Sequence, residues 1–167
     1  MSTPLTPKDW QDNLFSAIGD GWMLITATKP DGSFNTMTAS WGGGGIFWGK
    51  PVVAVGIRPE RYTYEFAEAD TRLSLSFFDG HREALRLCGT KSGRDCDKVA
   101  LSGLTPVRDR EGYVYFAEAK TVALGRKLYA DDLKEGCFSD PSLLSRWYSD
   151  GGLHRIYVCE IEELFHP

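Results

Sequence analysis

The sequence predicts a mainly β fold, in the form of an antiparallel β-barrel with helices at its periphery. Short runs of β-branched and aromatic residues recur along the chain and are separated by turn-forming residues. The helical patterns are scattered between these runs and do not alternate regularly with them, which disfavours a doubly wound parallel sheet. No G-x-G-x-x-G follows a predicted strand, so a Rossmann dinucleotide fold is not supported either.

Length and composition indicate an ordinary globular protein. We expect one domain over residues 1–167, which is long enough to bury a substantial core. The net charge of −4 makes a nucleic acid or an anionic membrane an unfavourable main partner. No apolar run approaches the roughly 20 residues that span a bilayer. The first ten residues lack the basic and apolar regions of a secretory signal, so we expect a cytoplasmic protein.

Neither the cysteines nor the histidines form a metal-binding motif. The four cysteines show no C-x-x-C spacing, which argues against a zinc ribbon or a thioredoxin-like pair. The three histidines are too scattered for a motif such as H-E-x-x-H. We therefore expect reduced thiols and no bound metal. These residues are Cys88, Cys96, Cys137, Cys159, His81, His154 and His166.

The first predicted element is a helix that begins at Pro7. Thr6 would be its N-cap, and Asp9 occupies the capping-box position. Apolar side chains then recur every four residues and form one stripe, which favours a continuous helix up to the glycines of residues 19–21. This stripe consists of Trp10, Leu14 and Ile18.

The remaining elements follow from alternating patterns and turn residues. Residues 22–28 and 33–41 predict a hairpin, because Lys-Pro-Asp-Gly between them is typical of a turn. Further strands are expected at 51–58, 72–78, 104–108, 113–124 and 154–161, with a turn at 109–112. Helices are expected from Thr63, over 81–87 and over 141–147, and a polar loop over 88–98.

The glycine run G-G-G-G-I-F-W-G-K-P, residues 42–51, resembles a phosphate-binding loop of nucleotide hydrolases. Pro51 stands where that loop needs a hydroxyl to coordinate Mg²⁺. The loop should also open a helix whose amides face the phosphates, whereas a β-branched run follows Pro51. A nucleotide triphosphatase is therefore disfavoured, and the glycines need another explanation.

Three segments concentrate polar and aromatic residues. In residues 35–41, small hydroxyl side chains precede glycine, so a ligand can approach the backbone, and Trp41 adds a flat apolar surface. In residues 57–66, Arg58, Arg61 and a helix-capping Thr63 would suit a phosphate monoester. Residues 91–98 add further cations.

Each segment also has a simpler interpretation: an exposed strand, a capped surface helix and a solvated loop. Together, however, they would seat a planar, phosphorylated cofactor. FMN suits them better than a triphosphate, because nothing in these segments coordinates Mg²⁺.

The ordered series of these motifs also resembles a known family. N-T-M-T-A-S-W, I-R-P-E-R-Y-T-Y-E-F, S-G-R-D-C-D-K and H-R-I-Y-V-C-E-I are similar to the flavin reductase-like, FMN-binding split-barrel family, close to its flavoredoxin branch. The resemblance implies a six-stranded antiparallel split barrel. It also implies a homodimer, with one FMN bound per subunit near the subunit interface.

The resemblance further implies roles for individual residues. The ring-binding residues would be Thr38, Ala39, Ser40 and Trp41, with Asn35 nearby. The phosphate-binding residues would be Arg58, Arg61, Tyr62 and Thr63, with Lys98 adding charge. His154 is a candidate contact of a nicotinamide, and no other catalytic residue is implied. The glycines of residues 42–45 would form a tight turn towards the cofactor, with Phe47 and Trp48 as its cover.

These expectations describe an FMN-binding oxidoreductase. NADH or NADPH would reduce the bound flavin, which would pass electrons to a second flavin or to a protein acceptor. The alternative is a non-enzymatic FMN electron carrier that exchanges electrons with a redox protein partner. A flavin-storing or ligand-sensing barrel is a third interpretation.

Overall fold

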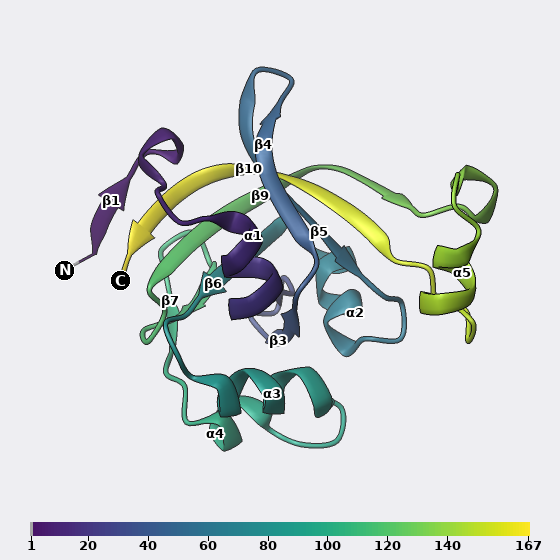
Figure 1. The fold of residues 1–167 in the computed structure, drawn as a ribbon. Helices are drawn as coiled ribbons and strands as arrows, with labels where there is room; N and C mark the ends of the chain where they lie inside the picture. Colours follow the sequence, from purple (N-terminus) through teal and green to yellow (C-terminus); the bar gives the residue numbers. More distant parts are fainter. Residues whose placement is uncertain (1) are drawn as a thin grey trace.

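A curved antiparallel sheet forms the centre of the protein in the computed structural model, which describes residues 2–167 (Figure 1). This sheet has eight strands: seven follow the order β3-β2-β6-β9-β10-β5-β4, and β1 pairs with β10. The predicted mainly β class with peripheral helices is confirmed. The strand number exceeds the expected six, because the N-terminal residues pair with β10 and the glycine run pairs with β5.

The elements have the following bounds. The central strands are β1 (Thr3–Leu5), β2 (Met23–Thr28), β3 (Phe34–Ala39), β4 (Gly42–Phe47), β5 (Lys50–Ile57), β6 (Arg72–Phe77), β9 (Thr121–Asp132) and β10 (Arg155–His166). A separate two-stranded sheet contains β7 (Pro106–Arg108) and β8 (Val114–Phe116). The α-helices are α1 (Leu14–Ser16), α2 (Tyr62–Ala69), α3 (Arg82–Thr90), α4 (Lys98–Ser102) and α5 (Ser142–Trp147). Short helical turns of other types are η1 (Pro7–Asp9), η2 (Ala17–Gly21) and η3 (Glu135–Cys137).

The predicted hairpin of β2 and β3 is confirmed, and its register runs from Met23 opposite Ala39 to Thr28 opposite Phe34. Gly32 has φ +85° and its N–H donates to the Lys29 carbonyl at 2.9 Å, which closes the turn. Every side chain of β2 is buried, because the strand lies between β3 and β6 and is covered on both faces.

Two hydrophobic clusters hold the helices against this sheet. Met23 and Ile25 of β2 point into the first cluster, which α2 closes with Phe66. Leu24 points to the opposite face and joins the second cluster, to which α3 contributes Leu85. Alternation along one strand therefore fixes α2 and α3 on different faces of the sheet.

The continuous helix predicted from Pro7 is wrong. Residues 7–9 form only the turn η1, and a new helix starts after Asn13, whose side chain accepts a 3.0 Å hydrogen bond from the Phe15 N–H. Trp10 packs edge-on against Phe77, with ring centroids 5.3 Å apart. Trp10, Leu14 and Ile18 therefore reach the core from separate short elements. The packing of Trp10 and the cap formed by Asn13 decide the local structure, although the spacing of the apolar residues suits one continuous helix.

The glycine run forms a strand, contrary to the expected loop. β4 pairs with β5 in a regular register, and residues 48 and 49 form the two-residue turn, with φ +51° and +70°. The β4–β5 hairpin projects beyond the rest of the sheet (Figure 1). Since each strand residue advances about 3.3 Å, β4 carries Phe47 and Trp48 away from residues 38–41 of the same chain. They do not cover those residues.

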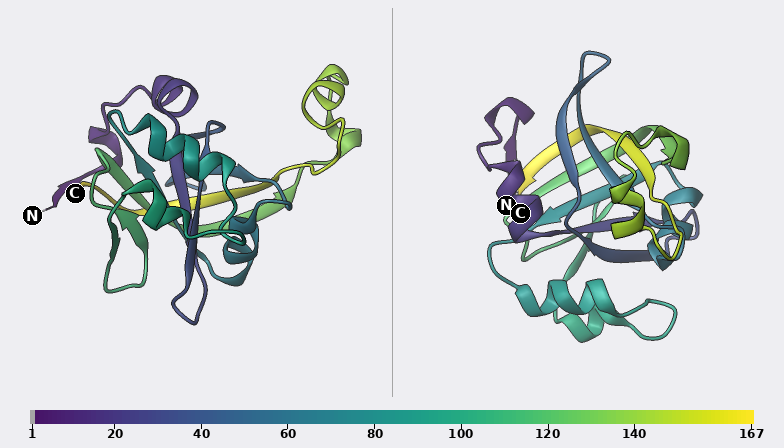
Figure 2. Two further views of the ribbon diagram at one scale, coloured as in Figure 1. Left: turned by 90° about the horizontal axis from the view of Figure 1, so that it is seen from below. Right: turned by 45° about the vertical axis from the view of Figure 1, so that its right-hand side comes forward.

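A second projection carries α5. This segment leaves the sheet after β9 and returns at β10, and it stands away from the body in two views (Figures 1 and 2). None of the helices within residues 2–167 has the length and apolar character that would let it cross a membrane.

Candidate functional site

Asn35 of β3 and Thr63 of α2 form the centre of the first group of site residues. The Asn35 Nδ2 donates to the Thr63 Oγ1 at 2.8 Å, and both side chains are buried. Thr63 does not cap the helix as predicted, because α2 begins one residue earlier and Arg61 occupies the N-cap position. The Thr63 hydroxyl instead points towards β3, and its hydrogen bond with Asn35 connects the predicted segment of residues 57–66 to that of residues 35–41.

Arg61 has a buried guanidinium nitrogen, Nη2, without a hydrogen-bond partner in the described part of the chain. Burial lowers the pKa of Arg61 below its ordinary value, although the group stays charged at neutral pH. A buried donor without an acceptor is costly and rare in native proteins. The arrangement is therefore one that an added anion would complete.

Lys98 is a second buried cation, with only 3% of its surface exposed. Its Nζ donates to the carbonyl oxygens of Cys88 at 3.1 Å and Lys91 at 3.2 Å. Burial lowers the pKa of Lys98 to about 8, and the charge of Arg61 acts in the same direction. Within residues 2–167 no carboxylate forms an ion pair with this ammonium group.

A cavity of about 780 Å³ opens beside this group, and its lining includes Asn35, Tyr62 and Lys98. The loop of residues 91–98 covers it: Arg94 pairs with Glu65 at 2.5 Å and lies over the Tyr62 ring at 4.8 Å. Gly93 lies so close to Asn35 that an added Cβ would overlap the Asn35 Oδ1. A glycine is therefore required where the loop closes over β3.

Trp41 and His154 belong to a second group, at the other end of β3. Their rings lie 4.9 Å apart, and Trp41 also contacts Trp147 of α5 edge-on at 5.1 Å. The Tyr148 hydroxyl lies 2.7 Å from the His154 Nδ1. Burial lowers the pKa of His154, and Arg58 and Arg61 lower it further, so the imidazole is neutral at pH 7.

Arg58 contacts residues of this second group. Its guanidinium donates to the Trp147 carbonyl, lies 3.5 Å from the Asp150 carboxylate and stacks 5.2 Å from the Tyr148 ring. The charges of Arg58 and Arg61 both act on the His154 imidazole. The α5 segment, which had no assigned role, supplies the partners of Arg58.

The predicted ring-binding residues separate into two sets. The Thr38 hydroxyl donates to the Leu85 carbonyl of α3, and Ala39 packs against the core. Ser40 and Trp41 instead line a cavity of about 400 Å³ with Phe15 and the glycines of residues 42–44. Of the four predicted side chains, the last two therefore line this cavity.

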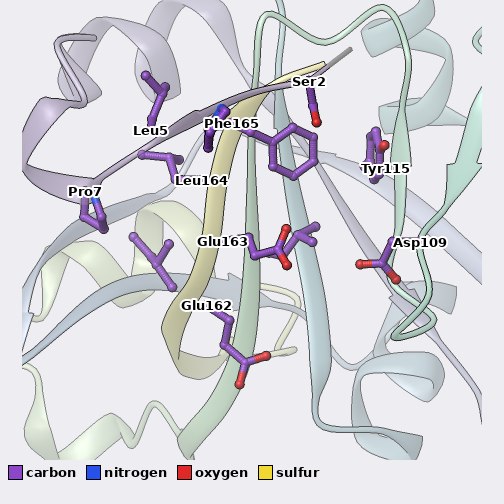
Figure 3. A pocket seen from close by; sticks show the side chains of 12 residues that line it. Ser2, Leu5, Pro7, Asp109, Tyr115, Glu162, Glu163, Leu164 and Phe165 are labelled. Carbon is purple, nitrogen blue, oxygen red and sulfur yellow. The ribbon is translucent and has the colours of Figure 1, made fainter.

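A further cavity, of about 380 Å³, lies where β1 meets β10 (Figure 3). Asp109, Glu162 and Glu163 line it, and no lysine or arginine does so within the described residues. An anionic ligand would be repelled there. The group around Arg61 and Lys98 is therefore the better candidate for a phosphate.

Comparison with known proteins agrees with this fold. The family model for the flavin reductase like domain matches residues 15–167. The chain belongs to the flavin reductase-like family. A comparison with curated protein sequences gives no match.

Solved structures with the same fold include two flavoredoxins and a reductase. The flavoredoxin of Methanosarcina acetivorans is 18% identical, with a TM-score of 0.69 over 88% of this chain and 68% of that one. The flavoredoxin of Desulfovibrio vulgaris (Miyazaki F) is 20% identical, with a TM-score of 0.67 over 87% and 69%. An NADH:FAD oxidoreductase of Streptomyces globisporus is 15% identical, with a TM-score of 0.65 over 88% and 75%. At these identities the likeness shows a shared fold, whereas the match of the family model confirms the predicted family.

Sequence reasoning missed three contributors to the two groups. Trp147 and Tyr148 form an aromatic pair that lies seven and six residues before His154, respectively, and this pair was a detectable signal. Gly93 stood in the polar loop, but its contact with Asn35 depends on a fold that brings residues 35 and 93 together.

Proposed function

We propose that the protein is an FMN-binding oxidoreductase that takes electrons from NADH or NADPH and passes them to a flavin or a protein acceptor. The observation that carries this proposal is the buried Arg61 Nη2 without a partner, close to the buried cation of Lys98. Membership of the flavin reductase-like family supports the same cofactor class. Bound FMN would supply the redox chemistry, and the chain would bind it, orient it and exclude water.

The phosphate of FMN would fit the group around Arg61. A phosphate offers an acceptor to the Arg61 Nη2, which has no partner within residues 2–167, and negative charge to both cations, since the Lys98 Nζ donates only to uncharged carbonyl oxygens. Each charge-assisted hydrogen bond contributes about 1.5–3 kcal/mol. The wall of this site would be formed by Asn35, Tyr62 and Thr63. A 2.8 Å hydrogen bond joins Asn35 to Thr63, and Arg94 of the loop of residues 91–98 lies over the Tyr62 ring.

The ring of FMN would lie at the other end of β3. Ser40 and Trp41 face a cavity there, and the backbone of Thr38 and Ala39 connects this end to Asn35. One strand would therefore position both ends of an elongated ligand. The Thr38 side chain holds α3 in place and does not itself face the cavity.

We assign His154 to the binding of the nicotinamide. A neutral imidazole avoids the repulsion that an imidazolium would exert on the positively charged ring of the oxidised nicotinamide. The Tyr148 hydroxyl holds the Nδ1 side of the ring, which leaves Nε2 available to a substrate. Arg58 keeps Trp147 and Tyr148 in contact with His154, so its role would be positional.

The absorption spectrum of the freshly purified protein tests the cofactor. A yellow preparation with flavin bands, or saturable binding of added FMN, supports the proposal, whereas a colourless protein that does not bind FMN contradicts it. Anaerobic addition of NADH or NADPH then tests the activity. Rapid bleaching of the flavin bands supports the enzyme, and bound FMN that neither nucleotide reduces supports the electron carrier.

A further inference from the structure

A cavity that the proposed function does not use lies between the N-terminal residues and the β4–β5 hairpin. Its volume is about 550 Å³, which lies in the range of small-molecule sites. The η1 turn and the hairpin, which contribute to its walls, project from the same side of the sheet (Figures 1 and 2). The open ends of β-barrels often bind ligands, so this cavity is a candidate second site.

Apolar side chains form the two facing walls of this cavity. Trp10 and Leu14 belong to the N-terminal wall, and Ile46 and Pro51 belong to the hairpin. Ile161 of β10 lines the cavity as well. Ile46 is 68% exposed in this structure, so a ligand with an apolar body would remove its side chain from water. The walls therefore favour a hydrophobic ligand.

Lys8 gives the cavity an excess of positive charge. Within residues 2–167 no carboxylate forms an ion pair with Lys8, which lines the cavity. Asp12 lines it too, but its carboxylate already accepts a 2.6 Å hydrogen bond from the Lys120 Nζ. Asp9 follows Lys8 in the chain but does not line the cavity, and its carboxylate accepts a 2.5 Å hydrogen bond from the Thr6 hydroxyl. An anionic group would therefore meet an available cation at Lys8.

We propose that this cavity binds a hydrophobic carboxylate, an organic acid whose apolar body lies between the two walls and whose carboxylate contacts Lys8. A neutral hydrophobic molecule would lack the attraction to Lys8, and an organic cation would be repelled by it. The apolar walls would supply most of the affinity, because an ion pair at an exposed lysine contributes little.

The cavity adjoins the one in which the flavin ring is proposed to lie. Leu14 and Gly44 line both cavities, whereas Ser40 and Trp41 line only the proposed ring cavity. The two shared residues are close together, since a Cβ added at Gly44 would lie 3.0 Å from the Leu14 Cδ1. The carboxylate site is therefore separate from the proposed FMN site, and its occupancy does not depend on the proposed function.

Isothermal titration calorimetry with 2-naphthoate as the probe tests the site. We expect one binding event per chain with a Kd of about 0.1–1 mM, because a small ligand gains limited binding free energy per atom. The neutral alcohol 2-naphthylmethanol has the same apolar body and should bind about threefold to fivefold more weakly. No saturable binding of 2-naphthoate, or equal affinities for the two compounds, contradicts the proposal.

Lys8→Gln tests the contact with the carboxylate. This variant should lose the preference for 2-naphthoate over 2-naphthylmethanol and keep its affinity for the alcohol. Lys91→Gln is the matched control, because Lys91 is exposed and is not among the residues that line this cavity. A preference for 2-naphthoate that survives in Lys8→Gln overturns the role of Lys8.

Ile46→Glu tests the position of the apolar body. A carboxylate on the hairpin wall should repel 2-naphthoate and weaken its binding about tenfold or more. Phe47→Glu is the matched control, because neighbouring side chains of a strand point to opposite faces and Phe47 does not line the cavity. Ile46 and Phe47 are 68% and 56% exposed, so either glutamate can reach water and the Tm should show that both variants stay folded. Equal effects of the two substitutions contradict the proposed site.

Titration in the presence of saturating FMN separates this inference from the proposed function. The affinity for 2-naphthoate should be retained, because the two ligands would occupy different cavities. Displacement of 2-naphthoate by FMN means that the probe enters the ring cavity and overturns the separate site. A protein that binds 2-naphthoate but no FMN contradicts only the proposed function, and a protein that binds FMN but no 2-naphthoate contradicts only this inference.

Discussion

Asn35 and Thr63 are 28 residues apart in the sequence and are joined by a buried 2.8 Å hydrogen bond. This contact ties the edge strand β3 to the first turn of α2, next to the cations of Arg61 and Lys98. The geometry of the proposed phosphate site therefore depends on a polar contact inside the fold.

Thr63→Val should destabilise the protein without changing its shape. The substitution keeps the volume of the side chain but leaves the buried Asn35 amide without its acceptor, and such a loss costs about 1–3 kcal/mol. The free energy of unfolding in urea measures this effect. Combining Thr63→Val with Asn35→Leu should cost less than the sum of the two single changes, and full additivity would show that the two side chains do not interact.

Arg61→Gln should weaken FMN binding and leave the flavin-free protein at least as stable. Losing one or two charge-assisted hydrogen bonds would raise the Kd by about one to two orders of magnitude. The flavin-free protein loses a buried, incompletely bonded charge, so its Tm should not fall. Fluorescence titration gives the Kd, and Arg86→Gln, at an exposed position on α3, serves as the control. A large drop in the Tm of the flavin-free variant would mean that Arg61 has a structural role.

FMN affinity should fall as the pH rises through about 8, because Lys98 loses its proton there. The stability of the flavin-free protein should change in the opposite direction. Burial lowers the pKa of Lys98 in the folded state, so between about pH 8 and the ordinary lysine pKa of 10.5 the unfolded chain binds more protons, and stability rises with pH. Lys98→Met should remove both trends, whereas Lys91→Met, on the exposed part of the loop, should keep them. Titrations and melting curves from neutral pH to about pH 10 provide the test.

Gly93→Ala should open the loop of residues 91–98. The added methyl group would overlap the Asn35 Oδ1, and forced overpacking of this kind costs about 1–3 kcal/mol. Both the Tm and the FMN affinity should fall. Gly136→Ala is the matched control, because no atom lies within 4 Å of its added Cβ and its φ is not positive. Equal effects of the two substitutions would contradict the close contact of the loop with β3.

The strands and the hairpin of β2 and β3 could be predicted because alternation and turn residues are local signals. The helix from Pro7 could not, because Asn13 starts a new helix and Trp10 is held by Phe77. The local sequence predicts a loop for the glycine run because glycine has a low strand propensity, yet pairing with β5 and the turn at residues 48–49 keep it extended.

The candidate site was predictable in its residue types but not in the directions of its side chains. Asn35, Arg61 and Lys98 come together because β3, α2 and the following loop meet at one place. Thr38 and Arg58 point elsewhere, towards α3 and the α5 segment. These directions depend on packing between elements far apart in sequence, and no local pattern in the sequence carries that information.

The α5 segment touches the body through Trp41 and Trp147, whose rings meet edge-on at 5.1 Å. Indole emission is sensitive to its surroundings, so this contact gives the protein a built-in optical probe. Any movement of the α5 segment relative to the sheet would change the fluorescence of these two tryptophans, so the rate of that movement could be measured without attaching a dye.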